Sequence, residues 1–375
     1  MKTKNKLYEV LVLFLKLGTI GFGGPLANIA LMEQEAVHKR KWVDQQDFLD
    51  MLAITNLIPG PNAVEMALHL GYAYAGNAGL WVAGSAFILP SFLMILGLSI
   101  LYADYGSIPQ VEAIFYAINP LLISIIINSA FHMGKEVLKD WKAIVVFAVF
   151  LLAAILGLNE TLVIILAGAV WVLVKLPKKH NLKLNLLYFL PILPEGVANQ
   201  HTSVPFIFLY FLKTGSVLFG SGLALLALIQ NDVVNKFHWL TQQQLIDAIT
   251  IGQVTPGPVS STATFIGYQV AGIPGAVAAT VGIFLPSFLI VLLIMKWIPN
   301  IKRGGVFHDF LQGVTIGVLA LILVVAYRIF QSAITDIFTA IIAVTGLFLL
   351  WRYKVETIYL VLAGIAISLI KFYVF

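Results

Sequence analysis

The chain has 375 residues, of which 60% are hydrophobic and only 11% are charged. A soluble domain carries about 25% charged residues, so this composition excludes an ordinary soluble protein. The chain has no cysteine, which excludes disulfides, iron–sulfur clusters and thiol nucleophiles. The net charge is +5, and the lysines and arginines lie mainly in short loops. This pattern indicates that positive loops orient the protein in the membrane, rather than a nucleic-acid partner.

Apolar stretches begin near residue 7 and recur to the end of the chain. About 20 apolar residues suffice to cross a bilayer as a helix, so the sequence predicts an all-α polytopic membrane protein. We interpret the N-terminal segment as retained, because Lys16 interrupts its apolar run and no small-residue cleavage site follows. The stretches form two sets of six, at roughly 7–30, 48–75, 78–102, 112–134, 141–157 and 161–176, then 204–230, 245–270, 273–299, 307–330, 334–350 and 357–372.

The two sets are related by an internal repeat. Phe14-Leu15-Lys16-Leu17-Gly18 recurs as Phe211-Leu212-Lys213-Thr214-Gly215, and Pro59-Gly60-Pro61 recurs as Pro256-Gly257-Pro258, both at an offset of 197 residues. A single-residue deletion then gives an offset of 196, at which Leu89-Pro90-Ser91 recurs as Leu285-Pro286-Ser287. We therefore predict an N-terminal repeat at 1–176, a linker at 177–203 and a C-terminal repeat at 204–375.

The charges of equivalent loops predict that the halves lie in opposite orientations. Residues 103–111 contain no Lys or Arg, whereas the equivalent 296–303 contains three; 135–142 contains three, whereas 331–336 contains none. Positive loops stay inside, so this alternation indicates inverted repeats. The linker is too short to cross the membrane, so each half must cross an odd number of times.

One of the six stretches in each half must therefore enter and leave on the same side. Pro59-Gly60-Pro61 divides the second stretch into two pieces that are each too short to span. Irregular backbone at membrane depth is tolerated where it faces protein or a wet cavity. We predict five transmembrane helices per half and one re-entrant helical hairpin tipped by Pro-Gly-Pro.

Glycine-rich breaks interrupt the first stretch of each half. Such a break can end one half-helix and begin another, whose free N–H groups and positive dipole end attract an anion. The alternative is close packing of helices through small residues. The candidate substrate-binding residues in the two breaks are Gly23, Gly24, Pro25, Gly220, Ser221 and Gly222.

The two Pro-Gly-Pro tips supply a second set of candidates. A proline suits the first turn of a helix, and the polar residues that follow it can either cap that turn or donate to a ligand. These candidates are Pro59, Gly60, Asn62, Gly257, Ser260 and Ser261.

Three ionisable residues lie within apolar stretches. Lys16 and Lys213 occupy equivalent positions, where an ammonium costs about 3 kcal/mol on insertion scales and is usually functional. We predict that both help to neutralise a dianion; the alternative is snorkelling to the interface. Glu65, replaced by Thr262 in the second half, is a candidate for coupling to protons or a hydrogen-bonded structural acid. For Asp50 and Asp247 we favour helix capping or support of the helix dipole.

The sequence contains no P-loop, no dinucleotide fingerprint and no HExxH or GxSxG motif. ATP is therefore not expected as a direct energy source, and no catalytic residue, metal or cofactor is predicted. A membrane enzyme acting on lipid would need a nucleophile or a metal constellation, which the sequence does not supply.

Together these motifs resemble the chromate ion transporter family in its two-domain form. The resemblance rests on Phe22-Gly23-Gly24-Pro25, on Asn56 through Asn62 with Glu65, and on Phe219 through Gly222, Gln253 through Pro258 and Leu285-Pro286-Ser287. It covers essentially the whole chain and adds Asn56 to the substrate-binding candidates. The second break departs from the pattern, because Ser221-Gly222 replaces Gly24-Pro25.

The resemblance implies export of chromate, with sulfate as a related anion, across the bacterial cytoplasmic membrane. We expect secondary active transport in which the two inverted repeats alternate access to one site. A passive anion channel and a transporter of another small anion are the alternatives. The expected partners are the oxyanion and the lipid bilayer, with no nucleic acid and with a homodimer left open.

Overall fold

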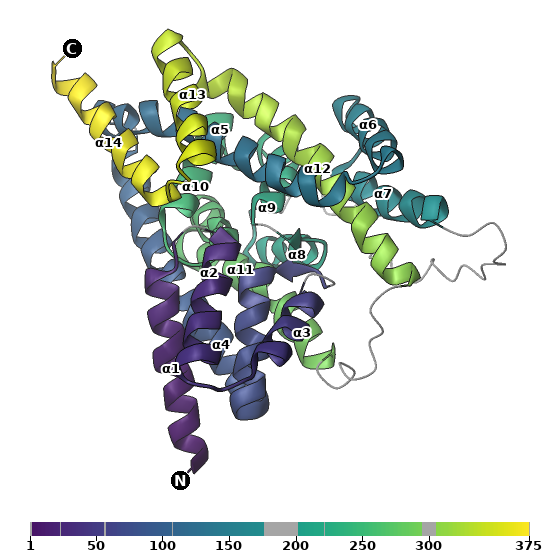
Figure 1. Ribbon diagram of the computed structural model, residues 1–375. Coiled ribbons are helices and arrows are strands. Elements are labelled where there is room, and N and C mark those ends of the chain that lie inside the picture. Colours follow the sequence, from purple (N-terminus) through teal and green to yellow (C-terminus); the bar gives the residue numbers. More distant parts are fainter. Residues whose placement is uncertain are drawn as a thin grey trace.

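The computed structural model describes residues 2–22, 24–55, 58–106, 108–175, 202–220, 222–294 and 305–374, and it is almost entirely helical (Figure 1). The candidates Gly23, Asn56 and Ser221, and the linker up to residue 201, lie outside these residues. The first half contains α1 (Lys2–Ile20), α2 (Gly24–Glu33), the π-helix η1 (Gln34–Lys39), α3 (Gln45–Thr55), β1 (Gly60–Pro61), α4 (Asn62–Tyr105), α5 (Pro109–Val137), α6 (Trp141–Ile155) and α7 (Glu160–Lys175).

The second half repeats this order of elements. It contains α8 (Val204–Ser216), β2 (Phe219–Gly220), α9 (Leu223–Gln230), the π-helix η3 (Asn231–Lys236), α10 (Gln242–Val254), the 3-10 helix η4 (Val259–Ser261), α11 (Thr262–Ile294), α12 (Val306–Ala333), α13 (Ile337–Arg352) and α14 (Thr357–Val374). Even the π-helices recur at equivalent places, so the sequence repeat is a structural repeat in the described parts of both halves.

Long apolar helices are present in both halves. Within the described residues, those of sufficient length and hydropathy to cross a membrane are Asn62–Tyr105, Phe115–Val137, Val259–Ile294 and His308–Ala333. Shorter apolar helices include Trp141–Ile155, Val204–Ser216, Ile337–Arg352 and Thr357–Tyr373. The structure thus supports a polytopic membrane protein, while five crossings and one hairpin per half stay a prediction.

The helices α4 and α11 each consist of two arms joined by a sharp reversal. In α11 the helix breaks at Ala271 and Gly272, and the hydroxyls of Thr264 and Thr280 lie 2.8 Å apart. Sixteen residues of straight helix would separate them by about 24 Å at 1.5 Å per residue. The two arms therefore run back along each other.

The same reversal occurs in α4. The backbone there leaves the helical region at Ala75 and Gly76, and Gly76 has a φ of 67°, which a residue without Cβ adopts at no cost. On either side, a Cβ added to Gly71 would lie 2.4 Å from the carbonyl oxygen of Gly79. Small residues let the two arms touch, as is typical of helix pairs in membranes.

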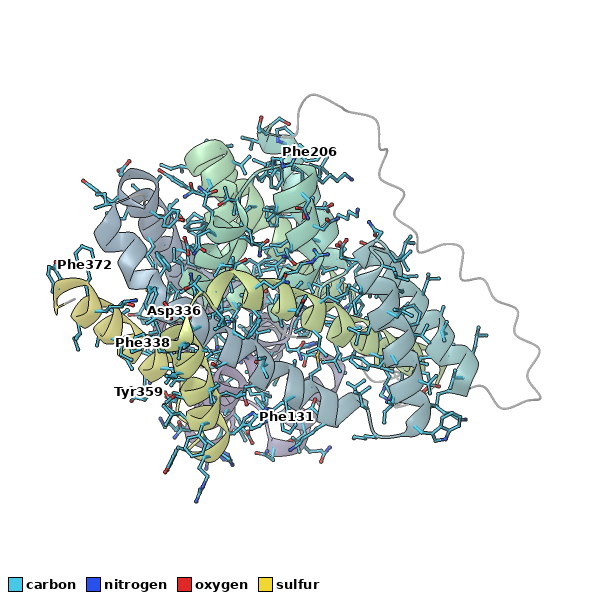
Figure 2. All side chains as sticks on the ribbon, turned by 90° about the horizontal axis from the view of Figure 1, so that it is seen from above. Phe131, Phe206, Asp336, Phe338, Tyr359 and Phe372 are labelled. Carbon is cyan, nitrogen blue, oxygen red and sulfur yellow. The ribbon has the colours of Figure 1, made fainter. Side chains whose placement is uncertain are left out.

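The two halves interlock through exchanged helices. Helix α5 of the first half packs against α13 and α14 of the second, and α12 of the second packs against α6 and α7 of the first. Figure 1 shows α6 and α7 beside α12 on one side, and α13 and α14 beside α5 on the other. The α5 contact includes a hydrogen bond from the Tyr116 hydroxyl to Asp336, which lies next to Phe338 at the start of α13 (Figure 2). Neither half has a complete core alone.

Candidate functional site

The first Pro-Gly-Pro turn meets the glycine-rich break of the second half. Gly60 and Pro61 pair with Phe219 and Gly220 as two short parallel strands. Gly60 has a φ of 148°, a conformation that residues with a side chain rarely adopt. This pairing joins segments 159 residues apart (Gly60 to Phe219) and gives two broken segments a shared backbone hydrogen-bond pattern.

The second Pro-Gly-Pro turn makes the reciprocal contact with the first half. The Gly257 N–H donates to the carbonyl of Gly21 over 2.9 Å. Gly257 is the repeat equivalent of Gly60, and Gly21 is the equivalent of Leu218, which directly precedes the second strand. All four broken segments are therefore joined crosswise between the halves, as expected for parts of one site.

Two helices of the first half begin at these breaks. α1 ends at Ile20, α2 begins at Gly24 with Pro25 in its first turn, and α4 begins at Asn62 directly after Pro61. The first N–H groups of a helix have no partner within the helix, and they carry its positive dipole end. The glycine-rich break of the second half also packs tightly against the second Pro-Gly-Pro turn. A Cβ on Gly222 would lie 3.1 Å from the Ser260 nitrogen.

Buried polar side chains surround the first Pro-Gly-Pro turn. Glu65 is fully buried. A Cβ built on Gly60 would lie 2.1 Å from Glu65 Oε1 and 2.2 Å from Ser287 Oγ, so all three groups crowd together. The equivalent Thr262 instead donates its hydroxyl to the carbonyl of Val259 over 2.8 Å. One half thus places a carboxyl where the other places a satisfied hydroxyl.

The second Pro-Gly-Pro turn is followed by two hydroxyls with no protein partner. Ser260 and Ser261 are both fully buried in η4, and neither Oγ atom makes a hydrogen bond. Buried polar groups are normally paired, so an unpaired hydroxyl needs an explanation such as a ligand. The predicted alternative, in which these hydroxyls cap the helix, is not what the structure shows. Asn62 at the equivalent turn is half-buried.

The lysines have acidic neighbours within their own halves. Lys16 Nζ lies 2.9 Å from Glu35 Oε1, and this carboxylate also contacts Lys39 at 3.0 Å and Arg40 at 3.5 Å. The Lys16 side chain is 49% exposed, and the structure shows no contact between it and Lys213.

The second half repeats part of this arrangement of charges, although Phe237 stands at the position of Arg40. Asp232 and Lys236 stand at the positions of Glu35 and Lys39, and Asp232 lies within the electrostatic influence of Lys213 and Lys236. We missed this acidic partner in the sequence, although the repeat offset that pairs the two lysines also pairs Glu35 with Asp232.

The favoured interpretation of Asp50 and Asp247, as helix caps or as support for the helix dipole, is wrong, because neither lies in the first turn of its helix. The Asp47 N–H donates to Asp44 at the start of α3, and Thr241 caps α10. A helix cap precedes the first turn. Both aspartates stand further along their helices. Asp247 is buried and accepts from the Tyr102 hydroxyl over 2.7 Å.

Asp247 belongs to a cleft of about 620 Å³ at the start of α10. Neutral polar side chains from both halves line much of it: Tyr102, Tyr116, Asn119, Gln243 and Gln269. Helix α10 runs from this cleft to the second Pro-Gly-Pro turn. In the described part of the chain, no group of three His, Asp or Glu residues could hold a metal ion.

Comparison with known proteins identifies relatives over nearly the full length. A family described as chromate transporter matches residues 8–173 and 206–369. A probable chromate transport protein of Synechococcus elongatus is 34% identical over 94% of this chain and 93% of its own. A chromate transport protein of Cupriavidus metallidurans is 34% identical over 96% and 92%. An uncharacterized transporter of Bacillus subtilis is 34% identical over 44% of this chain and 85% of its own. No solved structure matches.

Proposed function

The chain belongs to the chromate transporter family, and on that premise we propose that it exports chromate, or a similar oxyanion such as sulfate, by secondary active transport. The membrane is the bacterial cytoplasmic membrane, which the chain crosses several times. Three relatives carry chromate transport in their names. The membrane potential favours outward movement of an anion by about 2.3 kcal/mol per charge for each 100 mV.

The reciprocal contact between turns and breaks is the observation that carries this proposal. Each Pro-Gly-Pro turn hydrogen-bonds the glycine-rich break of the opposite half. Broken helices at the interface of two repeats are the usual location of transporter substrate sites. In our proposal the repeats, 1–176 and 204–375, are inverted and carry five crossings and one hairpin each. Rocking of one repeat against the other opens the joined segments to either side in turn.

The proposed site recognises its anion through neutral donors. The helix starts at Gly24 and Asn62 offer backbone N–H groups, and Ser260 and Ser261 offer buried hydroxyls. Neutral donors fit a tetrahedral oxyanion because it presents acceptors in every direction. Lys16 and Lys213 contribute positive potential near the breaks, while Glu35 holds Lys16 in place.

Glu65 is the proposed coupling residue. It is buried beside the first Pro-Gly-Pro turn, and the second half has no carboxyl at the equivalent position. Charged residues within membrane segments commonly mark proton relays. An ionised carboxylate would repel a dianion in the same site, so protonation of Glu65 controls oxyanion binding, while the membrane potential drives the anion outward.

Uptake of labelled chromate and sulfate into proteoliposomes tests the function. We expect saturable uptake of at least one anion that responds both to a pH gradient and to an imposed potential. If neither anion moves, the substrate assignment fails. Conductance that is independent of the pH gradient and saturates weakly would instead indicate a passive anion channel. Cross-linking in the same liposomes would decide whether the protein is a homodimer.

A further inference from the structure

Two serines at equivalent positions of the repeat face the Pro-Gly-Pro turns. Ser91 and Ser287 close the two Leu-Pro-Ser repeats, in the second arms of α4 and α11. A Cβ on Gly257 would lie 2.9 Å from the Ser91 Cβ, and a Cβ on Gly60 would lie 2.2 Å from the Ser287 Oγ. Each serine therefore touches the turn of the opposite half.

The same arms also touch the glycine-rich breaks of their own halves. A Cβ on Gly18, shortly before the first break, would lie 2.4 Å from the carbonyl oxygen of Phe87, one helical turn before Ser91. Gly215 makes the equivalent approach to Ile283, one turn before Ser287. Each serine thus lies where the helix leading into one break meets the turn from the other half.

Both hydroxyls are buried without a conventional partner. Ser91 and Ser287 are fully buried, and neither Oγ makes a hydrogen bond of normal geometry, although that of Ser287 lies beside the Glu65 carboxyl. A helical serine can normally satisfy its hydroxyl on the carbonyl one turn earlier, and Ser99 of α4 does so by donating to Ile95 over 2.7 Å. The protein fold itself gives no structural use for the Ser91 hydroxyl, and the Ser287 hydroxyl has the Glu65 carboxyl as its polar neighbour.

We propose that Ser91 and Ser287 are substrate-binding residues that donate their hydroxyls to a tetrahedral oxyanion held between the two Pro-Gly-Pro turns. This inference rests on the proposed function, because it assigns two further donors to the same site. The serines are related by the repeat, so they approach the anion from opposite halves. Their environments differ: Ser287 shares its place with Glu65, whereas Ser91 faces only the backbone of the second turn.

Alanine variants test the proposal against a matched control. We expect Ser91→Ala and Ser287→Ala each to raise the KM for chromate or sulfate about tenfold, equivalent to about 1.4 kcal/mol. The temperature of unfolding should stay unchanged or rise, because alanine removes a buried unpaired polar group. Ser99→Ala, at an equally buried serine whose hydroxyl is satisfied, should leave KM unchanged. A wild-type KM in both folded variants would overturn the proposal.

Thiol labelling separates this inference from the proposed function. The chain has no cysteine, so Ser91→Cys, Ser287→Cys and Ser99→Cys each introduce a single thiol. We expect a small water-soluble methanethiosulfonate to label the first two and not the third, and sulfate to slow this labelling several-fold. If the wild type transports neither anion but sulfate still slows the labelling, the result would count against the proposed transport and support the binding site. Absent labelling, or labelling that sulfate does not slow, would overturn the serine assignment.

Discussion

The two halves share the same backbone elements and differ in the side chains at their Pro-Gly-Pro turns. Each has a broken first segment, a Pro-Gly-Pro turn, a helix that reverses at an Ala-Gly pair, and a long helix packed against the other half. The side chains at the turns do not match, since Glu65 is replaced by Thr262. Under the proposed function, the repeat supplies the mechanism for motion, and the unmatched Glu65 is the residue proposed to couple it to protons.

The largest expected effect comes from filling the first turn. In Gly60→Ala the new Cβ would lie within about 2.2 Å of the Glu65 and Ser287 oxygens, and the φ of 148° is strained for alanine. We expect chromate uptake to fall at least a hundredfold. Gly257 has a φ of 97°, which is also strained for alanine, but Gly257→Ala should cost less because its nearest atom is 2.9 Å away.

Gly97→Ala is the matched control for these two variants. It lies in the helical second arm of α4, where nothing is within 4 Å of the added Cβ. Uptake at the wild-type level is expected because alanine also favours a helix. If Gly257→Ala proved more damaging than Gly60→Ala, the crowding around Glu65 would not be the cause.

The second largest effect is expected from a substitution that removes the chemical difference between the halves. Glu65→Gln keeps the size of the side chain and removes the ionisable group, so we expect the response to a pH gradient to disappear while the membrane potential still drives uptake. Rates should fall about tenfold. Thr262→Ser, which keeps the hydroxyl at the equivalent position, is the control and should retain the pH response. An intact pH response in Glu65→Gln would place the coupling elsewhere.

The repeat could be predicted well from the sequence because matching residues recur at a nearly constant offset along the chain. Shared offsets identified equivalent residues such as Lys16 and Lys213 without any structure. They could not show which elements cross between halves, because packing such as α5 on α13 is determined by the surfaces of distant segments. The favoured role of Asp247 failed because Thr241 caps α10 instead. Its actual partner Tyr102 lies 145 residues away, where no local sequence pattern indicates it.

The lysines should have a smaller effect than the turn residues. Glu35 keeps two cationic neighbours when Lys16 is removed, so its burial stays compensated. We expect Lys16→Ala to lower uptake two- to fivefold and to cost less than about 1 kcal/mol of stability, as is usual for a half-exposed ion pair. Lys213→Ala tests the equivalent position. Lys16→Arg is the charge-preserving control, and normal uptake by both alanine variants would exclude the lysines from the site.

The smallest expected effect concerns helix caps, which the two halves share. Asp44 accepts the Asp47 N–H over 2.7 Å, and Thr241 accepts the Gln244 N–H over 3.1 Å within a capping box. Removal of a cap typically costs about 1 kcal/mol. Asp44→Ala and Thr241→Ala should therefore lower the temperature of unfolding by similar amounts and leave the KM for the oxyanion unchanged.

Ser216→Ala is the control for the cap variants, because this exposed hydroxyl donates only to the Leu212 carbonyl of its own helix. Its unfolding temperature should match the wild type. Equal destabilisation by the two cap variants, with an unchanged KM in both, would show that the starts of α3 and α10 are structurally equivalent. A change in KM confined to Thr241→Ala would instead show that the nearby cleft, which includes Thr241, takes part in substrate entry. The difference between the halves would then extend from the turns to the start of α10.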